Sequence, residues 1–315
     1  MKRLLLSLCV FSLTVAAWAQ GNGNGNGNGK TELNLPDPPM LGRHFVRGEA
    51  GLGSPFKSPN LSYHNGPVLT SPSNIQAIFW GTKWANASFA ADKIDGPNHD
   101  GNGGLDAFYK GADLSFYTGT NTEYTDTTAL HVSSRVSYQG HSIDTTAAPS
   151  KAPSTSAILN EVCKVVGSNV TARGYYPVYV DTPRGSANYC AWHSWGSCNG
   201  TPIEFGFFFN LDGDPGCDPG DASGQHSQGL AALANVSGHE LSETMTDPSG
   251  NAWYDNQGSE NADKCAWSFG TPLVTLANGT QWMIQGNWSN TAYAAGTGYA
   301  NRSGQKGCLD GGNYK

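Results

Sequence analysis

The sequence is poor in charged side chains, and those present give it an acidic balance. Only 14% of its 315 residues are Asp, Glu, Lys or Arg, and the formal net charge is -7. It has no cluster of basic residues, so it lacks the electrostatic footprint of a non-specific nucleic-acid-binding protein. Beyond the N-terminal leader it has no apolar run long enough to cross a membrane. We therefore expect neither a nucleic-acid nor a membrane partner.

The sequence also lacks several catalytic motifs. There is no Gly-x-Ser-x-Gly elbow of the kind that serine hydrolases use. None of the cysteine spacings is typical of a zinc–cysteine site, and the even number of cysteines beyond the leader predicts three disulfides instead. These six residues are Cys163, Cys190, Cys198, Cys217, Cys265 and Cys308. The spacing leaves their pairing open.

The N-terminus has the three parts of a secretion signal. Lys2 and Arg3 supply the charge, residues 4–16 are apolar, and residues 17–19 form an Ala-x-Ala cleavage site. We expect residues 1–19 to be removed and the protein to be secreted, extracellular and monomeric. Residues 20–62, which begin with alternating Gly and Asn, are expected to form a flexible tether and an extended arm or propeptide.

The remainder, residues 63–315, is predicted to be one loop-rich α/β (α+β) domain with a mixed sheet. The 41 Gly and 17 Pro favour many turns and few helices. Runs of β-branched and aromatic residues predict strands, and three- and four-residue apolar spacing predicts helices. The predicted strands are near residues 74–80, 130–138, 176–180, 203–209, 273–276 and 281–285, and the helices are at 106–117, 155–166 and 228–246.

A His-Glu-x-x-Glu pattern lies in the last of these helices. His239 and Glu243 are four residues apart, so a helix places them on one face as two potential metal ligands. Glu240 follows His239 and is a candidate general base. Glu260 is a candidate third ligand, and Asp263 a carboxylate that orients His239. The structural alternative is a helix with ordinary charged residues.

His193 lies in an aromatic stretch and has two possible roles. It is a candidate catalytic residue that polarises a substrate carbonyl, or a ligand that completes the metal shell if Glu260 does not. The alternative is a histidine hydrogen-bonded among packed aromatics. A second possible ion site is the loop at residues 212–221, where four Asp on a Gly-rich turn suggest Ca²⁺, although the EF-hand pattern is absent.

Several short motifs together resemble the EXORDIUM, or phosphate-induced protein 1, family. They lie at residues 63–70, 75–81, 238–243, 251–254, 260–265 and 306–308, with a looser match around residues 190–193 and at Cys217. Plant members of that family are secreted cell-wall proteins linked to growth by cell expansion. The resemblance implies a secreted globular protein and leaves the substrate open.

The layout of the helix and its downstream acids also resembles the zincin metallopeptidases. Carried over by position, His239, Glu243 and Glu260 would bind the metal, Asp263 would support them, and Glu240 would activate water. The sequence departs from the zincin HExxH pattern because Glu243 replaces the second histidine. One imidazole with two carboxylates is a harder ligand set, which binds Zn²⁺ less selectively and tolerates Mn²⁺ or Fe²⁺.

We therefore expect a secreted metal-dependent peptidase acting on extracellular proteins or peptides. In this reading residues 205–209 are an edge strand that pairs with an extended peptide substrate. The alternative function is a non-catalytic, EXORDIUM-type extracellular protein that binds or acts at the cell wall. Tryptophans in the C-terminal third would then stack on wall polysaccharide, and a site without activity would retain a structural ion.

Overall fold

The computed structural model of the protein describes residues 37–48, 60–96 and 103–312. These belong to one compact unit that extends from Asp37 to Lys315. The predicted signal at residues 1–19 and the tether at residues 21–29 lie outside the described residues. Within the described ranges, no helix combines the length and the apolar character that a membrane span requires.

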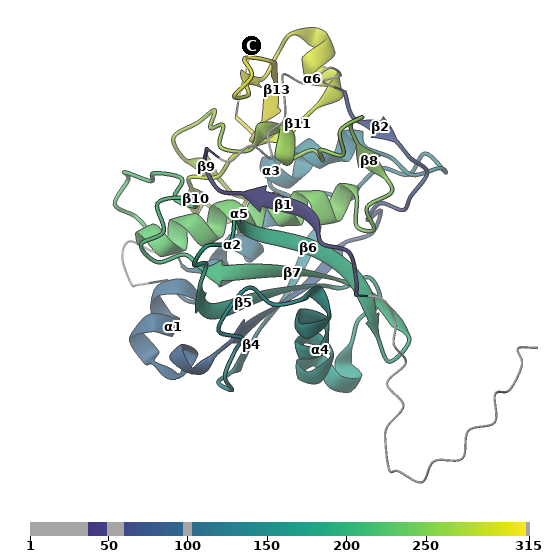
Figure 1. Ribbon diagram of the computed structural model, residues 1–315. Coiled ribbons are helices and arrows are strands. Elements are labelled where there is room, and N and C mark those ends of the chain that lie inside the picture. The colour runs from purple at the N-terminus through teal and green to yellow at the C-terminus, as the bar shows by residue number, and fades with distance from the viewer. Residues whose placement is uncertain (1–36, 49–59, 97–102, 313–315) are drawn as a thin grey trace, which may run out of the picture. The chain divides into compact units, whose positions relative to one another are not determined.

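A mixed six-stranded sheet forms the centre of the unit, in the order β1-β6-β7-β5-β3-β4 (Figure 1). The strands are β1 (Leu41–Phe45), β3 (Ser73–Trp80), β4 (Val136–Asp144), β5 (Tyr175–Pro183), β6 (Tyr189–Cys198) and β7 (Thr201–Asn210). Strands β4, β3, β5 and β7 are parallel, whereas β6 is antiparallel to β7 and β1 is antiparallel to β6. The predicted mixed sheet is confirmed. β1 precedes Tyr63, near which the sequence predicts the domain to begin.

The central strands form where aromatic and β-branched residues are dense. β3, β5 and β7 contain the predicted strands, whereas β4 begins at Val136, later than predicted. Burial on both faces explains the nearly continuous apolar run of β7, because a strand inside the sheet has no solvent face. The expectation that residues 205–209 form an edge strand is wrong: β7 lies between β6 and β5, and both of its edges are hydrogen-bonded.

Helices lie on both faces of the sheet, whereas the short α6 (Asn290–Ala295) packs against β13 (Lys306–Leu309) in the C-terminal part. The other helices are α1 (Ala87–Lys93), α2 (Leu105–Ala112), α3 (Phe116–Gly119), α4 (Thr155–Val166) and α5 (Gln228–Thr246). The predictions for α4 and α5 are confirmed. The single helix predicted at residues 106–117 is instead two, because Leu114 has a positive φ of 54° and the Ser115 hydroxyl caps the second by accepting from Thr118 N.

Helix α5 lies along one face of the sheet over β6 and β7, and α4 packs against the other face (Figure 1). The Ser227 hydroxyl caps α5 at its start by accepting from Leu230 N, and Pro248 follows its end. Residues 229–246 are all buried, so α5 is covered on every side rather than along one stripe. The hydroxyl of Tyr179 on β5 bonds Ser237 at 2.7 Å and ties the helix to the sheet.

The C-terminal third is made of short elements joined by loops. It contains β8 (Trp253–Tyr254), β9 (Val274–Thr275), β10 (Gln281–Trp282), β11 (Asn287–Trp288), β12 (Tyr299–Ala300) and β13 (Lys306–Leu309), with β2 (Ser62–Tyr63) paired to β8. The three predicted disulfides are confirmed, and they pair Cys163 with Cys198, Cys190 with Cys217, and Cys265 with Cys308. The last of these fastens a short 3₁₀ helix, η4 (Asp263–Cys265), to β13.

Replacing Phe208 with Ala tests the core beneath α5. Phe208 is fully buried and stacks on Tyr179 at 4.6 Å, so the change leaves a cavity under the helix. We expect a loss of about 3–5 kcal/mol in the free energy of unfolding, measured by denaturant titration. Phe116→Ala is the control, because that ring is 79% exposed and its removal should cost under about 0.5 kcal/mol. Equal losses in the two variants would contradict this picture of the core.

Candidate metal centre

Helix α5 supplies three of the six side chains predicted for the site. His239 and Glu243 lie one turn apart on the same face, with His239 Nε2 3.1 Å from Glu243 Oε1. Glu240 lies beside them, and all three residues have no solvent exposure. The buried face of α5 thus carries two carboxyl groups and an imidazole where an ordinary core helix carries apolar groups.

Strand β6 supplies His193 from the sheet below. Because side chains alternate along a strand, Trp192 points to the opposite face, where it stacks on Phe207. His193 therefore faces α5 rather than packing among the aromatic rings. Its Nδ1 lies 3.4 Å from Glu240 Oε2 and 3.6 Å from Glu243 Oε2.

The loop after α5 supplies Glu260 and Asp263. Glu260 Oε2 lies 3.8 Å from His193 Nε2, and Asp263 Oδ1 lies 3.6 Å from His239 Nε2. Backbone N–H groups hold the loop in place: Asp263 N donates to Glu243 Oε1, and Glu260 N donates to Asp263 Oδ2. The six predicted residues thus meet in one place, although they come from a strand, a helix and a loop.

Two overlapping groups of side chains have the spacing of a metal site. In the described residues, His193, Glu243 and Glu260 each offer a ligand atom, and these atoms lie within 4.8 Å of one another. His239, Glu240 and Glu243 do the same. Glu243 belongs to both groups. The ligand set predicted from the sequence combines His239 with Glu260, but these two residues lie in different groups here.

When its carboxyl groups are ionised, the largely buried cluster has more negative than positive charge. Four carboxyl groups, of Glu240, Glu243, Glu260 and Asp263, face two imidazoles, so two negative charges would remain even if both rings were protonated. Several of the polar atoms make no hydrogen bond: both ring nitrogens of His193, Nε2 of His239, both carboxylate oxygens of Glu240, and one each of Glu243 and Glu260. Buried charges are normally paired or bound to metal, so this donor set fits a divalent cation.

Burial shifts the pKa values of the cluster in opposite directions. It raises the pKa of Glu240 and Glu260 well above the usual range, and burial together with repulsion from Glu243 raises that of Asp263 to about 7. Burial alone would lower the pKa of His193, but the carboxyl groups of Glu260 and Glu240 outweigh it and raise that pKa well above normal. In the absence of a metal ion the cluster therefore retains protons at neutral pH.

Gln285 determines where the proton of His239 sits. Its Nε2 donates to Ala262 O and its Oε1 accepts from Trp267 N, which fixes the orientation of the amide. The same Nε2 lies 2.9 Å from His239 Nδ1, which must then accept. Burial lowers the pKa of His239 to about 4, so the ring is neutral and its proton is on Nε2, beside Glu243. A metal-binding histidine normally donates its second N–H to an acceptor, and His239 has a donor there instead.

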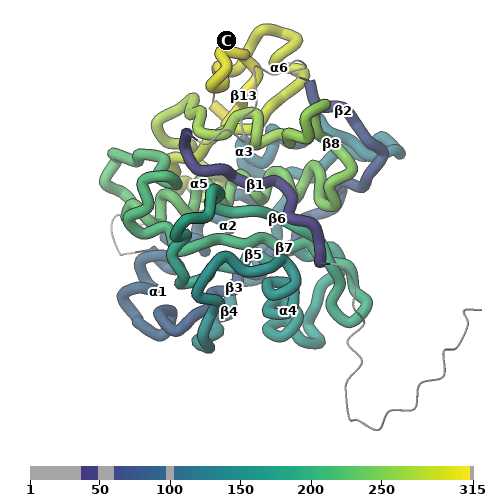
Figure 2. Tube along the Cα trace, viewed as in Figure 1, coloured from purple at the N-terminus to yellow at the C-terminus, as the bar shows by residue number. Residues whose placement is uncertain are grey.

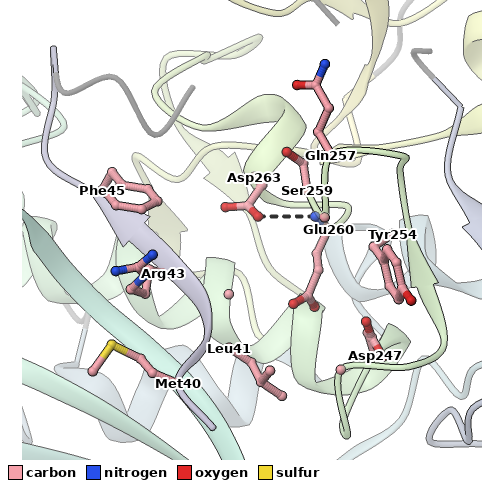
Figure 3. A pocket seen from close by; sticks show the side chains of 13 residues that line it. Met40, Leu41, Arg43, Phe45, Asp247, Tyr254, Gln257, Ser259, Glu260 and Asp263 are labelled. Atoms are coloured by element: carbon pink, nitrogen blue, oxygen red, sulfur yellow. Dashed lines mark hydrogen bonds between the residues drawn. The ribbon is translucent and has the colours of Figure 1, made fainter. Parts of the chain in front are cut away.

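A pocket of about 440 Å³ connects the cluster with the surface (Figure 3). One wall is Met40 and the strand that follows it, β1, with Leu41, Arg43 and Phe45, and the other is the segment from Asp247 to Ser259. Glu260 and Asp263 lie between these walls (Figure 3). A cation and a substrate therefore have a route to the carboxylates.

The sequence did not identify Gly42, His44 or Gln285, which complete the surroundings of the site. Gly42 and His44 belong to β1 and approach the cluster across the sheet edge, while Gln285 reaches His239 from 46 positions further along the chain. No local spacing links any of them to α5. A glycine and a glutamine carry no metal-binding signal in a sequence, and His44 stands outside the predicted domain.

The calcium hypothesis for residues 212–221 is not supported. Asp212 pairs with Lys93, Asp214 with Arg184 and Asp221 with His226, while Asp218 accepts from the backbone of its own turn. The four carboxyl groups therefore point to different partners instead of converging. In the described parts of the chain, the groups with metal-ligand spacing lie at α5 only.

Comparisons with known proteins give little guidance. No protein-family model matches the sequence, and no curated protein matches it. In the solved structures there is a likeness to the crystal structure of metalloproteinase-II from Bacteroides fragilis, with 13% identity and a TM-score of 0.28, covering 61% of this chain and 48% of that one. The chain thus spans about half the length of that protein. A similarity this low shows neither a shared fold nor a shared function.

Metal binding should release protons from the cluster near neutral pH. The raised pKa values mean that the carboxyl groups of Asp263, Glu240 and Glu260 and the ring of His193 hold protons that compete with a cation for the cluster. We therefore expect the affinity for Zn²⁺ or Mn²⁺ to fall as the pH is lowered through about 7. Calorimetric titration in two buffers of different ionisation enthalpy measures the protons released. An affinity that is independent of pH across this range would contradict the assignment.

Proposed function

We propose that the protein is a metal-dependent peptidase whose centre is the cluster between α5, β6 and the loop after α5. The observation that carries the proposal is the convergence of buried carboxyl groups with unpartnered atoms and a surplus of negative charge. A divalent cation bound there would act as a Lewis acid towards a peptide carbonyl. The adjoining pocket gives an extended chain access to that position.

We assign His193, Glu243 and Glu260 as the groups that hold the cation. They form one of the two sets with suitable spacing, and His193 has both ring nitrogens unpartnered. His239, a ligand in the sequence-based prediction, has its Nδ1 occupied by a donor, and we assign it to positioning Glu243. The ion is Zn²⁺, with Mn²⁺ or Fe²⁺ as the alternatives that a carboxylate-rich set accepts.

Glu240 is the group we assign to proton transfer. Both of its oxygens are buried and make no hydrogen bond, and burial raises its pKa well above the usual range, so the carboxyl holds a proton more readily than an exposed glutamate does. It lies beside His193 and Glu243 but is not one of the three residues that we assign as ligands. Asp263 buttresses the loop through its contact with Glu260 N.

The alternative is a secreted, non-catalytic protein of the EXORDIUM type that retains the ion as a structural element. The family resemblance of the motifs at residues 63–70 and 238–243 remains a prediction. The two functions differ in one measurable respect, because only the peptidase requires Glu240 to move a proton.

Glu240→Gln should keep the metal and lose peptide hydrolysis. The amide has nearly the same shape but cannot accept the proton, so we expect at least a ~100-fold fall in the rate of casein cleavage. Bound metal is measured by mass spectrometry after dialysis. Glu161→Gln on α4 is the matched control, and its metal content and activity should equal those of the wild type. A metal-loaded wild type without activity would support the non-catalytic alternative.

His193→Ala and His239→Ala distinguish the two ligand assignments. Removing a ligand abolishes stable binding, whereas removing a group that only positions Glu243 lowers affinity by about 10–100-fold. We expect His193→Ala to lose the ion on dialysis and His239→Ala to bind it more weakly but measurably. The reverse result would assign His239 as the ligand, as the sequence alone predicts.

A further inference from the structure

Strand β1 lies along the outer edge of β6 (Figure 2), and its residue Gly42 approaches Glu243 and His193 of the candidate metal centre. It pairs antiparallel with β6, with Leu41 opposite His193 and His44 opposite Ala191. Between these two pairs β1 has two residues, Gly42 and Arg43, where β6 has one. The extra residue makes β1 bulge there. The bulge brings the backbone of Gly42 against His193.

Gly42 approaches the cluster more closely than any other residue type could. A Cβ at this position would lie 2.0 Å from Glu243 Oε2 and 2.5 Å from His193 Nδ1, and the φ of Gly42 is +47°. Only a residue without a side chain allows the backbone to approach carboxylate and imidazole atoms to this extent. The bulge therefore places the Cα of Gly42 directly against Glu243 and His193.

The side chain of His44 fills a slot beside the centre. Its ring lies 4.3 Å from that of His239 and 4.5 Å from that of Trp267, and it is fully buried. Its Nε2 donates to Gln285 Oε1 at 2.9 Å. The slot thus accepts a planar ring with an N–H or O–H group at its end.

Side chains from both sides hold the main chain of this segment. Ser194 of β6 donates its hydroxyl to Pro39 O at 2.5 Å, and Trp267 donates its indole N–H to Phe45 O at 2.8 Å. An extended segment that is hydrogen-bonded along a strand and places alternate side chains in pockets has the contacts of a peptide ligand in β-strand addition.

We propose that Leu41–Phe45 is an internal occupant of the substrate groove, and that the groove's substrates are extended polypeptides with glycine over the carboxylates and a planar hydrogen-bonding ring two residues later. This inference rests on the proposed peptidase function. In the chain described here β1 competes with substrate for the edge of β6, and β6 pairs with substrate in those molecules in which β1 is displaced.

Gly42→Ala in the full chain tests whether β1 can leave. The new Cβ meets Glu243 and His193, so the strand is forced out while every groove residue is retained. We expect hydrogen–deuterium exchange in Tyr189–Cys198 to rise by roughly tenfold or more, equivalent to about 1.4 kcal/mol of lost strand binding. Gly119→Ala is the control, since a Cβ there meets nothing within 4 Å. Unchanged exchange in the Gly42 variant overturns the proposal.

His44→Ala provides a second variant should Gly42→Ala fail to fold. This variant removes the ring of His44 from its slot without introducing a clash. It should also raise hydrogen–deuterium exchange along β6. If both variants lose the fold, β1 is a permanent strand and the proposal is wrong.

A synthetic peptide of residues 37–47 separates this inference from the proposed function. Added to the Gly42→Ala variant, it should restore protection of β6 and inhibit cleavage of a Gly-x-His peptide, whereas the same peptide with Ala at position 42 should do neither. If the peptide restores exchange protection of β6 but no substrate is cleaved, the peptidase function is contradicted. The inference that the edge of β6 binds an extended peptide still stands in that case. Cleavage that ignores the Gly-x-ring pattern, or no protection by the peptide, would overturn the inference.

Discussion

The burial of several carboxyl groups around Glu243 is the constraint on which the rest of the structure depends. A carboxylate that leaves water must be protonated, paired or bound to a cation, because its desolvation costs several kcal/mol. Glu243 Oε1 accepts a hydrogen bond from Asp263 N, and the carboxyl group faces both imidazoles. Its other oxygen, Oε2, makes no hydrogen bond. The sheet, α5 and the disulfide-fastened loop hold this arrangement against the repulsion among the four carboxyl groups. A cation is the addition that satisfies all of them together.

Much of the fold follows from local sequence, and the parts that do not are those fixed by distant partners. In the sequence, β3, β5 and β7 are visible as runs dense in aromatic and β-branched residues, and the helices α4 and α5 as apolar residues at three- and four-residue spacing. The position of β7 inside the sheet is not visible in the sequence, because strand order depends on which strands pair. A strand buried on both faces has the same apolar composition whether it lies at the edge or in the centre. β1 was missed because five residues in a Gly- and Pro-rich stretch become a strand only when β6 supplies the hydrogen bonds.

Some residues of the candidate site are linked by their spacing in the sequence, and others come together only in the folded chain. His239, Glu240 and Glu243 share a helical turn, and Glu260 and Asp263 follow soon after, so spacing alone connects them. His193 was identified as a candidate from its residue type, but its approach to the carboxylates depends on the alternation of β6. The proton position on His239 is set by Gln285, whose own amide is oriented by Ala262 and Trp267. Such a chain of hydrogen bonds exists only in the folded molecule.

The disulfide between Cys265 and Cys308 has a consequence for the order in which the protein is made. It anchors the turn that carries Asp263 to a strand close to the C-terminus, and Gln285 also comes from this last part of the chain. The chain must therefore be synthesised at least as far as residue 308 before this disulfide can secure the carboxylate loop. Fragments that end before residue 308 lack this cross-link, so they cannot complete the centre in the way that the longer chain does.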